Sequence, residues 1–487
     1  MIILAIETSC DDTCVAILKV NLTGSPPEGV RENYPRLSGI SSLKNFLNKG
    51  QGRVKILSNI VSSQIKIHQE YGGVHPGLAK REHLRNLLPV LTRALKQSKL
   101  LKKFQIQKSN LKQNLLSHEI LHKQANSKFQ TLKKILKREK CLFENLKIFF
   151  RKYQKPDIDM IAITIGPGLE PCLWTGVNFA KALACFWDLP IAPVNHIEAH
   201  IVANWLLPVG NELKTQNSKL KTIEFPAICL VASGGHTQLI LMKNFSKYKI
   251  LGETRDDAAG ECFDKTARIL GLGYPGGPAI AAEAKKLQTA PHVGTSYKLQ
   301  AKLPRPMIYS KDYDFSFSGL KTAVLYEHKT HSEKINPRHP GCIFGTCSGK
   351  QKACPVKFVP QLFNRVNFCF PSLRLKIKKT KEYIGKMAQE IQQAIIDVLI
   401  KKTMNATREY KAKTIILGGG VTANEELRKQ FKLSVKRQAS SAKILIPSKK
   451  FSIDNAAMIG ITAYLQRPKG KTKNWKKIKA DANLRLK

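Results

Sequence analysis

The chain has 487 residues, and its 81 Lys and Arg outnumber its 35 Asp and Glu to give a formal net charge of +46. A hydrophobic content of 43% predicts a globular protein of two or three domains, and the lack of a run of about 18 apolar residues excludes a membrane-spanning helix. Because Met1–Glu7 lacks the basic start of a secretory signal and the eleven cysteines are scattered, we expect a cytoplasmic protein without a disulfide framework.

The first part of the chain predicts strands that alternate with helices. Short apolar runs next to polar turns indicate strands, and apolar residues at helical spacing indicate helices. The expected strands are 2–6, 14–20, 56–64, 160–165 and 191–194, and the expected helices are 81–95, 172–186 and 196–206.

The second part repeats this alternation and predicts an α/β protein. Its expected strands are 227–232, 238–242, 414–417 and 443–446, and its expected helices are 256–270, 386–409, one from 422 and 455–465. Glycine turns follow several elements in both parts, at 166–168, 234–235, 276–277 and 418–420. A protein that holds a nucleotide between two α/β halves needs such loops on each half.

Most of the positive charge lies in three segments. Residues 96–155 carry +14, residues 328–381 carry +11 and residues 467–487 carry +8, so that these segments hold +33 of the total. Clustered Lys and Arg favour a phosphate polymer as partner, although a solvated lysine-rich surface is the alternative. Residues 100–152 predict amphipathic helices, with Leu132, Ile135 and Leu136 at helical spacing, whereas 336–371 and 21–52 predict loops.

His196 and His200 lie four residues apart on a predicted helix. This spacing places both imidazoles on one face, where they can share a metal ion with a third ligand from elsewhere, usually a carboxylate. A zinc protease has a Glu directly after the first His or directly before the second, whereas Glu198 lies midway between them. The alternative is two histidines bonded to backbone or water.

Two glycine loops and several acids are candidates for ligand contacts. Ser233–Thr237 can form an anion-binding turn, although an ordinary hairpin turn is the alternative, and Gly418–Asn424 can bring backbone against an adenosine or phosphate. Asp454 is either a helix N-cap or a metal carboxylate. Asp264 is typical of a surface helix, and Tyr274–Pro278 is a rigid turn whose glycines can flank a ligand.

Taken together and in this order, these motifs resemble the family of tRNA N6-adenosine threonylcarbamoyltransferases, called TsaD in bacteria and formerly described as O-sialoglycoprotein endopeptidase. The segments that match the family pattern cover residues 1–20, 54–96, 156–327 and 382–466. The motifs that carry the resemblance are Ile6–Asp12, His75–His83, Gly166–Leu169, Asn195–His200, Ser233–Gln238, Asp256–Glu261, Phe263–Lys265, Tyr274–Pro278, Asp314–Lys321, Gly418–Asn424 and Asp454–Met458.

The resemblance implies an actin/Hsp70-like fold of two α/β lobes with the ligand in the cleft between them. The lobes are expected at 1–195, with insertions at 21–52 and 97–155, and at 196–466, with an insertion at 328–381, followed by a basic tail at 467–487. One divalent metal, iron in the first place and zinc as the alternative, is implied at His196, His200 and Asp454. The resemblance also implies that threonylcarbamoyl-adenylate is bound by Val231, Ala232, Ser233, Gly234, Gly235, Asp264, Gly277 and Asn424.

The implied reaction transfers the threonylcarbamoyl group to N6 of adenosine 37 in tRNAs that read codons beginning with A, with Asp11 as a candidate proton acceptor. The implied partners are tRNA and separate proteins of the TsaB and TsaE type. An actin-like ATPase, a metalloprotease and a tRNA-binding scaffold are the competing interpretations. The chain departs from the family pattern at His75–Leu78 and at Ala281, where relatives often carry an Asp.

Overall fold

A computed structural model describes residues 1–22, 52–104, 126–206, 223–245, 247–289, 302–335, 371–439, 441–466 and 474–486. Most residues of the expected loops at 21–52 and 336–371 lie outside these ranges, and the described ends of the first one, residues 21–22 and 52, belong to strands. The helix expected at 386–409 begins earlier, because α11 spans Pro371–Glu409.

Five strands form the first sheet, in the spatial order β3-β2-β1-β4-β5. The first three strands pair antiparallel, and the last two run parallel to β1. Along β1 the side chains alternate between two cores, with Ile3 and Ala5 in one and Leu4 and Ile6 in the other, so both faces of the sheet are covered. The strands are β1 (Ile2–Glu7), β2 (Asp12–Leu22), β3 (Gly52–Ser63), β4 (Met160–Gly166) and β5 (Ile191–Asn195).

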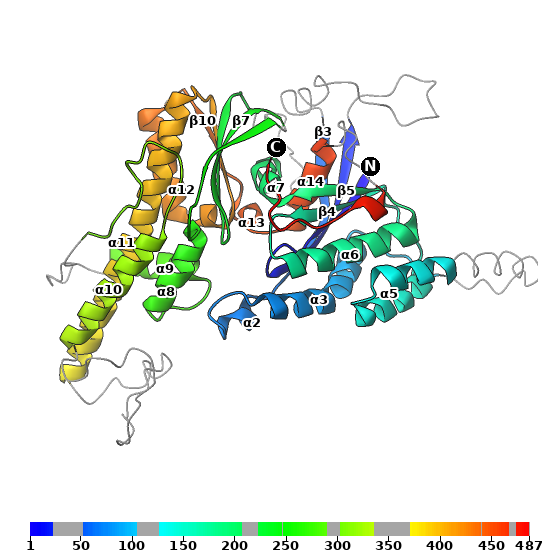
Figure 1. Cartoon of the computed structure of the whole chain (residues 1–487), viewed down its shortest axis with the longest axis horizontal. Coiled ribbons are helices and arrows are strands. Elements are labelled where there is room, and N and C mark those ends of the chain that lie inside the picture. Colours follow the sequence, from blue (N-terminus) through cyan, green and yellow to red (C-terminus); the bar gives the residue numbers. More distant parts are fainter. Residues whose placement is uncertain are drawn as a thin grey trace, which may run out of the picture.

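Helices cover the two faces of this sheet in different ways (Figure 1). The outer face packs against α3 and α6, and α5 packs against α3. The inner face packs against α14, which comes from the end of the chain. The helices named so far, with the short α2 that follows β3, are α2 (Ile65–Gln69), α3 (Pro76–Gln97), α5 (Lys140–Lys152), α6 (Glu170–Trp187) and α14 (Ala456–Gln466).

The second sheet repeats the topology of the first. Its order is β10-β9-β6-β7-β8, in which three consecutive strands pair antiparallel and the later two run parallel to the first of them. The strands are β6 (Ala227–Ala232), β7 (Thr237–Asn244), β8 (Lys247–Glu253), β9 (Thr414–Gly418) and β10 (Lys443–Leu445). Two sheets with the same strand order confirm the predicted two-lobed α/β fold of the actin/Hsp70 type.

The helices of the second half flank its sheet, and α10 and α11 lie at the far edge of the molecule (Figure 1). Helix α7 follows β5 directly and packs against β5, β6, β9 and α14, so it lies between the two sheets. The remaining helices are α7 (His196–Val202), η1 (Ala203–Trp205), α8 (Ala259–Ile269), α9 (Gly276–Thr289), α10 (Ser318–Ile335), η3 (Gly420–Ala423), α12 (Glu425–Gln438), α13 (Lys449–Ser452) and η5 (Trp475–Lys477).

Part of the first basic segment belongs to the core of the first lobe. Residues 126–135 are helical, as the apolar spacing predicts, and α5 follows them. Leu132, Leu136, Leu146 and Phe150 are buried in the core that also contains the apolar faces of α3 and α6. The described part of this segment is therefore a structural layer with charges on its outer side.

The basic tail packs onto both halves of the molecule. Asp481 donates its N–H to the Ile165 carbonyl at the end of β4, and Gly168 donates to the Ala482 carbonyl. Arg485 then forms an ion pair with Glu253 at the end of β8. Across the described ranges, no helix combines the length and the apolar character that crossing a membrane requires.

Candidate functional site

Two histidines of the candidate site are positioned by the start of α7. The Asn195 side chain caps this helix by accepting the N–H groups of Ile197 at 2.9 Å and Glu198 at 3.1 Å. Because the helix begins at His196, His200 lies one turn later on the same face. Both residues are buried, so their imidazoles lie in the shared core between the sheets and away from solvent.

Asp454 reaches the histidine pair from the link between α13 and α14. The cap at the start of α14 is supplied by its neighbour, because Asn455 Oδ1 accepts the N–H of Met458 at 3.1 Å. The alternative interpretation of Asp454 as an N-cap is therefore wrong. Its carboxylate instead lies 3.2 Å from His200 Nε2 and 3.5 Å from His196 Nε2.

These three side chains have the spacing of ligands around one metal ion. The two Nε2 atoms lie 3.1 Å apart, which together with the two distances to Asp454 completes a triangle of donor atoms. Two ligands of a four-coordinate ion with bonds of about 2.0–2.2 Å are separated by roughly 3.3–3.6 Å. Within the described residues this is the one group of His, Cys, Asp or Glu whose ligand atoms are close enough to hold a metal.

Charges around the triad set its protonation. Burial alone would lower the pKa of His196, but the carboxylates of Glu7 and Asp454 outweigh it and raise that pKa to about 9. Burial and the neighbouring His196 hold the pKa of His200 below its usual value. Burial would raise the pKa of Asp454, yet the two histidines hold it far below its usual range. The metal-free site therefore consists of an imidazolium, a neutral imidazole and a carboxylate.

Glu198 does not take part in this cluster. Its carboxylate accepts hydrogen bonds from the Tyr248 hydroxyl at 3.2 Å and from the Gln466 side chain at 2.5 Å. It is thus buried on a different side of α7 from the histidine pair, where it cannot activate a metal-bound water. The geometry agrees with the sequence argument against a metalloprotease.

The two predicted glycine loops lie side by side because β6 and β9 are parallel neighbours. Val231 pairs with Gly418 in this register. Gly419 has a φ of +88°, and a Cβ placed on it would lie 2.3 Å from the Ala232 carbonyl oxygen, so only glycine fits there. By contrast, a Cβ on Gly234, Gly235 or Gly277 would meet nothing within 4 Å, which leaves room for a ligand beside these backbones.

The remaining predicted residues lie around the same loops. Asp264 accepts the N–H of Gly276 at 2.6 Å, next to Gly277, and burial raises its pKa to about 6. Asp11 on the first lobe is close enough to contribute to this increase. Burial, followed by the charge of Asp454, raises the pKa of Asp11 itself.

Asn424 has a structural role at the start of α12. Its Oδ1 accepts the N–H of Leu427 at 3.0 Å, and its Nδ2 donates to Gln392 at 2.8 Å. One lone pair and one N–H of the amide remain for a ligand.

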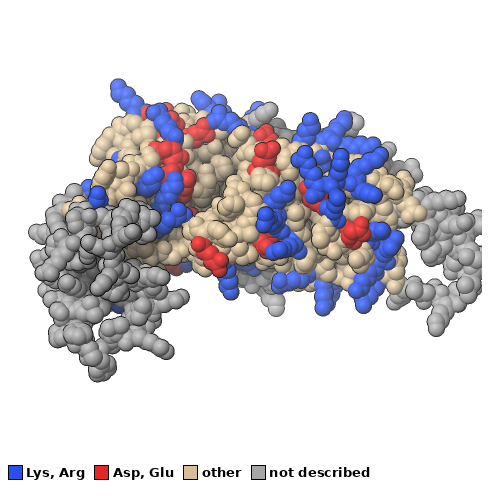
Figure 2. Space-filling view, turned by 60° about the horizontal axis from the view of Figure 1, so that its bottom comes forward, with Lys and Arg blue, Asp and Glu red and all other residues tan. Residues whose placement is uncertain are grey.

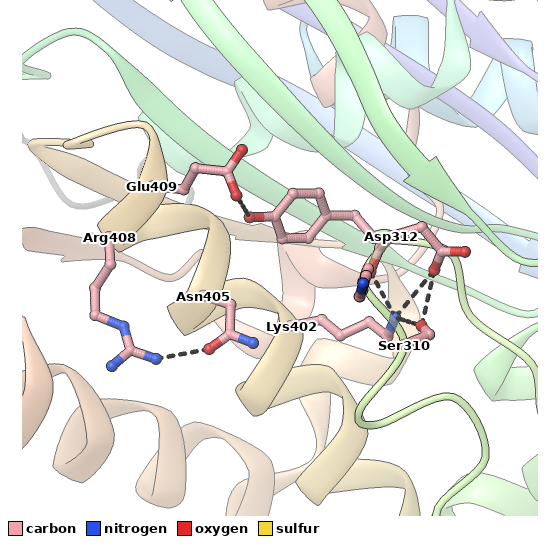
Figure 3. Close-up of a pocket in the computed structure, with 8 residues that line it drawn as sticks. Ser310, Asp312, Lys402, Asn405, Arg408 and Glu409 are labelled. Atoms are coloured by element: carbon pink, nitrogen blue, oxygen red, sulfur yellow. Dashed lines mark hydrogen bonds and ion pairs between the residues drawn. The ribbon is translucent and has the colours of Figure 1, made fainter.

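A cavity of about 300 Å³ lies elsewhere, between residues 310–313 and the end of α11 (Figure 3). The buried Lys402 ammonium donates to Ser310 Oγ at 2.7 Å and to the Asp312 carbonyl at 2.9 Å, and Tyr313 donates to Glu409. These polar groups satisfy one another, and none of the predicted site residues lines the cavity. We interpret it as a surface hollow beside a buried lysine that anchors the loop.

Sequence reasoning missed two residues beside the candidate metal ligands. Glu7 lies within a quoted motif but had no assigned role, and its Oε2 is 3.1 Å from His196 Nδ1. His236, in the Ser233–Thr237 loop, is close enough to the triad that burial and the neighbouring His196 and His200 lower its pKa to about 4. The only sign of a role for Glu7 in the sequence is that it is a polar residue at the end of a buried strand, and its partner His196 is 189 residues away.

Comparisons with known proteins give a consistent result. A family model described as TsaD, tRNA N6-adenosine threonylcarbamoyltransferase, matches residues 55–107 and 146–461. A protein of that name from Thermomicrobium roseum is 34% identical over 99% of this chain and 95% of its own length. Another from Syntrophomonas wolfei is 35% identical over 95% of this chain and 91% of its own length.

Solved structures give more distant likenesses. YeaZ from Pseudomonas aeruginosa is 10% identical with a TM-score of 0.22 and covers 52% of this chain and 67% of its own. A ROK family glucokinase from Streptomyces griseus, in complex with glucose and AMPPNP, is 9% identical with a TM-score of 0.34 and covers 95% of this chain and 99% of its own. Scores this low carry no argument about function.

Proposed function

The chain belongs to the tRNA N6-adenosine threonylcarbamoyltransferase family, and from this premise we propose how its residues perform the transfer. The reaction places the threonylcarbamoyl group of threonylcarbamoyl-adenylate on N6 of adenosine 37 in tRNAs that read codons beginning with A. The observation that carries the proposed site is the triangle of His196, His200 and Asp454, three donors from distant segments that converge between the two sheets. The family match does not favour an ATPase or a protease.

We infer that this triad binds one divalent metal per chain. Two imidazoles and a carboxylate suit iron or zinc, with iron as our first expectation, and the set lacks the thiolates of structural zinc sites. When bound, such an ion would polarise the carbamoyl carbonyl group as a Lewis acid. Because His196 is protonated in the metal-free site, its Nε2 must lose a proton before it can act as a ligand.

We propose that the glycine loops bind the adenylate. Beside β9, β6 ends at Val231 and Ala232, and the turn that follows contains Ser233, Gly234 and Gly235. The open space at Gly234 and Gly235 lets phosphate oxygens approach backbone N–H groups. Asp264 offers its second carboxylate oxygen to a ribose hydroxyl, and Gly277 leaves room beside it. The unused amide groups of Asn424 supply a further contact.

In the proposed step, the N6 nitrogen attacks the carbamoyl carbon and a new N–C bond forms. The C–O bond to the adenylate phosphate breaks, adenylate leaves with that electron pair, and N6 loses one proton. We propose that Asp11 accepts this proton, because its raised pKa makes it a better base than an exposed aspartate.

We propose that tRNA phosphates bind a lysine cluster on the first lobe. Figure 2 shows Lys and Arg side chains crowded over this end of the molecule. Lys181 on α6 is near Lys479 in the tail. Burial and the charge of Lys479 lower the pKa of Lys181. Two Trp rings lie among these amines, with Trp174 5.6 Å from Lys181 Nζ and Trp475 5.6 Å from Lys476 Nζ, as is typical of surfaces that contact nucleic acids. The lysine cluster consists of Lys128, Lys181, Lys476, Lys477 and Lys479.

We propose that separate proteins of the TsaB and TsaE type supply the intermediate and support turnover, as in the bacterial family. We also propose a cytoplasmic location, which is supported by the tRNA substrate and by the seven cysteines among the described residues, all of which are free.

Reconstitution tests the proposal. The purified chain, an unmodified tRNA transcript and threonylcarbamoyl-adenylate would be incubated with the partner proteins, and nucleosides would be read by mass spectrometry. We expect a threonylcarbamoyl mass increase at adenosine 37 that is lost, together with bound metal, in His196→Ala. Product formation by metal-free His196→Ala would refute the metal assignment.

A further inference from the structure

Glu7 is a fully buried carboxylate at the end of β1, the central strand of the first sheet. A carboxylate in such a place is strongly destabilising unless its oxygens accept hydrogen bonds. Oε1 accepts the N–H of Ser9, and Oε2 accepts the hydroxyl of Thr164, both at 2.5 Å. The third contact is the imidazole of His196, whose Nδ1 is 3.1 Å from Oε2.

Because of this contact, the two ring nitrogens of His196 have different neighbours. Nδ1 faces Glu7 and, at 3.3 Å, the Ser9 hydroxyl, whereas Nε2 faces His200 and Asp454. A carboxylate beside Nδ1 keeps the proton on that nitrogen, which leaves the lone pair on Nε2 for a metal. His200 has no such carboxylate, because its Nδ1 is buried without a hydrogen-bond partner among the described residues.

The hydrogen bonds to Glu7 also fix its own position. Ser9 N–H lies two residues further along the same chain segment, and Thr164 lies on β4, which is the parallel neighbour of β1. Since β5 is next to β4 and leads directly into His196, the carboxylate and the imidazole are held by two strands of one sheet, β1 and β5, which lie on either side of β4. Their separation is thus set by sheet geometry and not by a flexible loop.

We propose that Glu7 is a positioning residue that holds His196 with its proton on Nδ1 and its Nε2 directed at the metal. This rests on the proposed metal site and adds to it a fourth side chain that does not touch the ion. The competing interpretation is that Glu7 serves only the packing of β1 against β4. The two interpretations differ in what a neutral, isosteric replacement does to metal affinity.

The test compares Glu7→Gln with Glu198→Gln. Both variants neutralise one buried carboxylate of similar exposure, but Glu198 accepts hydrogen bonds from Tyr248 and Gln466, whereas Glu7 contacts the imidazole of His196. Zinc affinity of the full chain would be measured by competition with a chromogenic chelator, and the Co²⁺ absorption spectrum would report ligand geometry. We expect Glu7→Gln to weaken Zn²⁺ binding about 10- to 100-fold and to change the Co²⁺ spectrum, and Glu198→Gln to leave both within about twofold.

A wrong role for Glu7, a wrong metal site and a variant that does not fold would each give a different result. Equal Zn²⁺ affinity in Glu7→Gln and the wild type, or an equal loss in both variants, would overturn the positioning role. A wild type that binds no Zn²⁺ or Fe²⁺ would instead refute the proposed metal site, and the role of Glu7 with it. If Glu7→Gln does not fold, Thr164→Val removes one of the hydrogen bonds to the same oxygen, and unchanged Zn²⁺ affinity in that variant would overturn the proposal.

Discussion

Truncation of Leu146 tests whether the basic segment is part of the first lobe. Leu146 is completely buried in the core that α5 shares with α3 and α6. Leu→Ala at such a site removes packing and leaves a cavity, which costs about 2–5 kcal/mol. With a urea slope of about 2–3 kcal/mol per molar for a lobe of this size, the unfolding midpoint falls by roughly 1–2 M.

Ile148 provides a matched control on the same helix. It is similar in size but 64% exposed, so Ile148→Ala should change stability by less than about 0.5 kcal/mol. Urea unfolding would be followed by tryptophan fluorescence, to which Trp187 contributes from beside Phe150. Equal midpoints for Leu146→Ala and Ile148→Ala would show that α5 does not contribute to the stability of the first lobe, contrary to its burial.

Three further predictions concern the site and the surface. The pKa of His196 is about 9 in the folded chain and 6.5 in the unfolded chain, so the stability that its protonation contributes is complete below pH 6.5 and is lost as the pH rises to 9. Thermal unfolding of the metal-free chain in EDTA should therefore show a loss of up to about 3 kcal/mol over this pH range. His196→Gln should not show this loss. Gly419→Ala, with its clash at Ala232, should destabilise the chain by about 1–3 kcal/mol and weaken adenylate binding in calorimetry, whereas Gly420→Ala, which meets open space, should leave stability unchanged. The double variant Lys476→Glu/Lys479→Glu should bind tRNA more weakly in filter binding, with a shallower dependence of affinity on salt concentration, while its Zn²⁺ affinity stays constant. An unchanged salt dependence would show that the lysine cluster does not contact tRNA.

The strands and helices were largely predictable because their patterns are local. The buried run at 2–6 corresponds to β1, and the apolar spacing at 172–186 corresponds to α6. The same spacing identified the helix that contains Leu132 and Ile135, but periodicity does not say what a face packs against. The burial of that face against α3 and α6 could only come from the structure.

The metal triad was predictable in part. The spacing of His196 and His200 gave two candidate ligands, and the resemblance, not the spacing, supplied Asp454 as the third, from 254 residues later. Glu7 and His236 could not be assigned from sequence, because their relation to the triad depends on strand order. β1 lies two strands away from β5, and only that arrangement brings the end of β1 beside the start of α7.

The packing divides the proposed site between two cores. The ligand helix α7, the helix α14 that follows Asp454, and the strand β6 that leads into Ser233 all contribute to the core shared by the sheets. Asp264, the Gly277 turn and Asn424 instead lie on helices whose apolar residues Phe263, Ile280 and Leu427 fill the outer core of the second lobe. Since well-packed cores resist deformation, the triad keeps its geometry even if the outer helices shift.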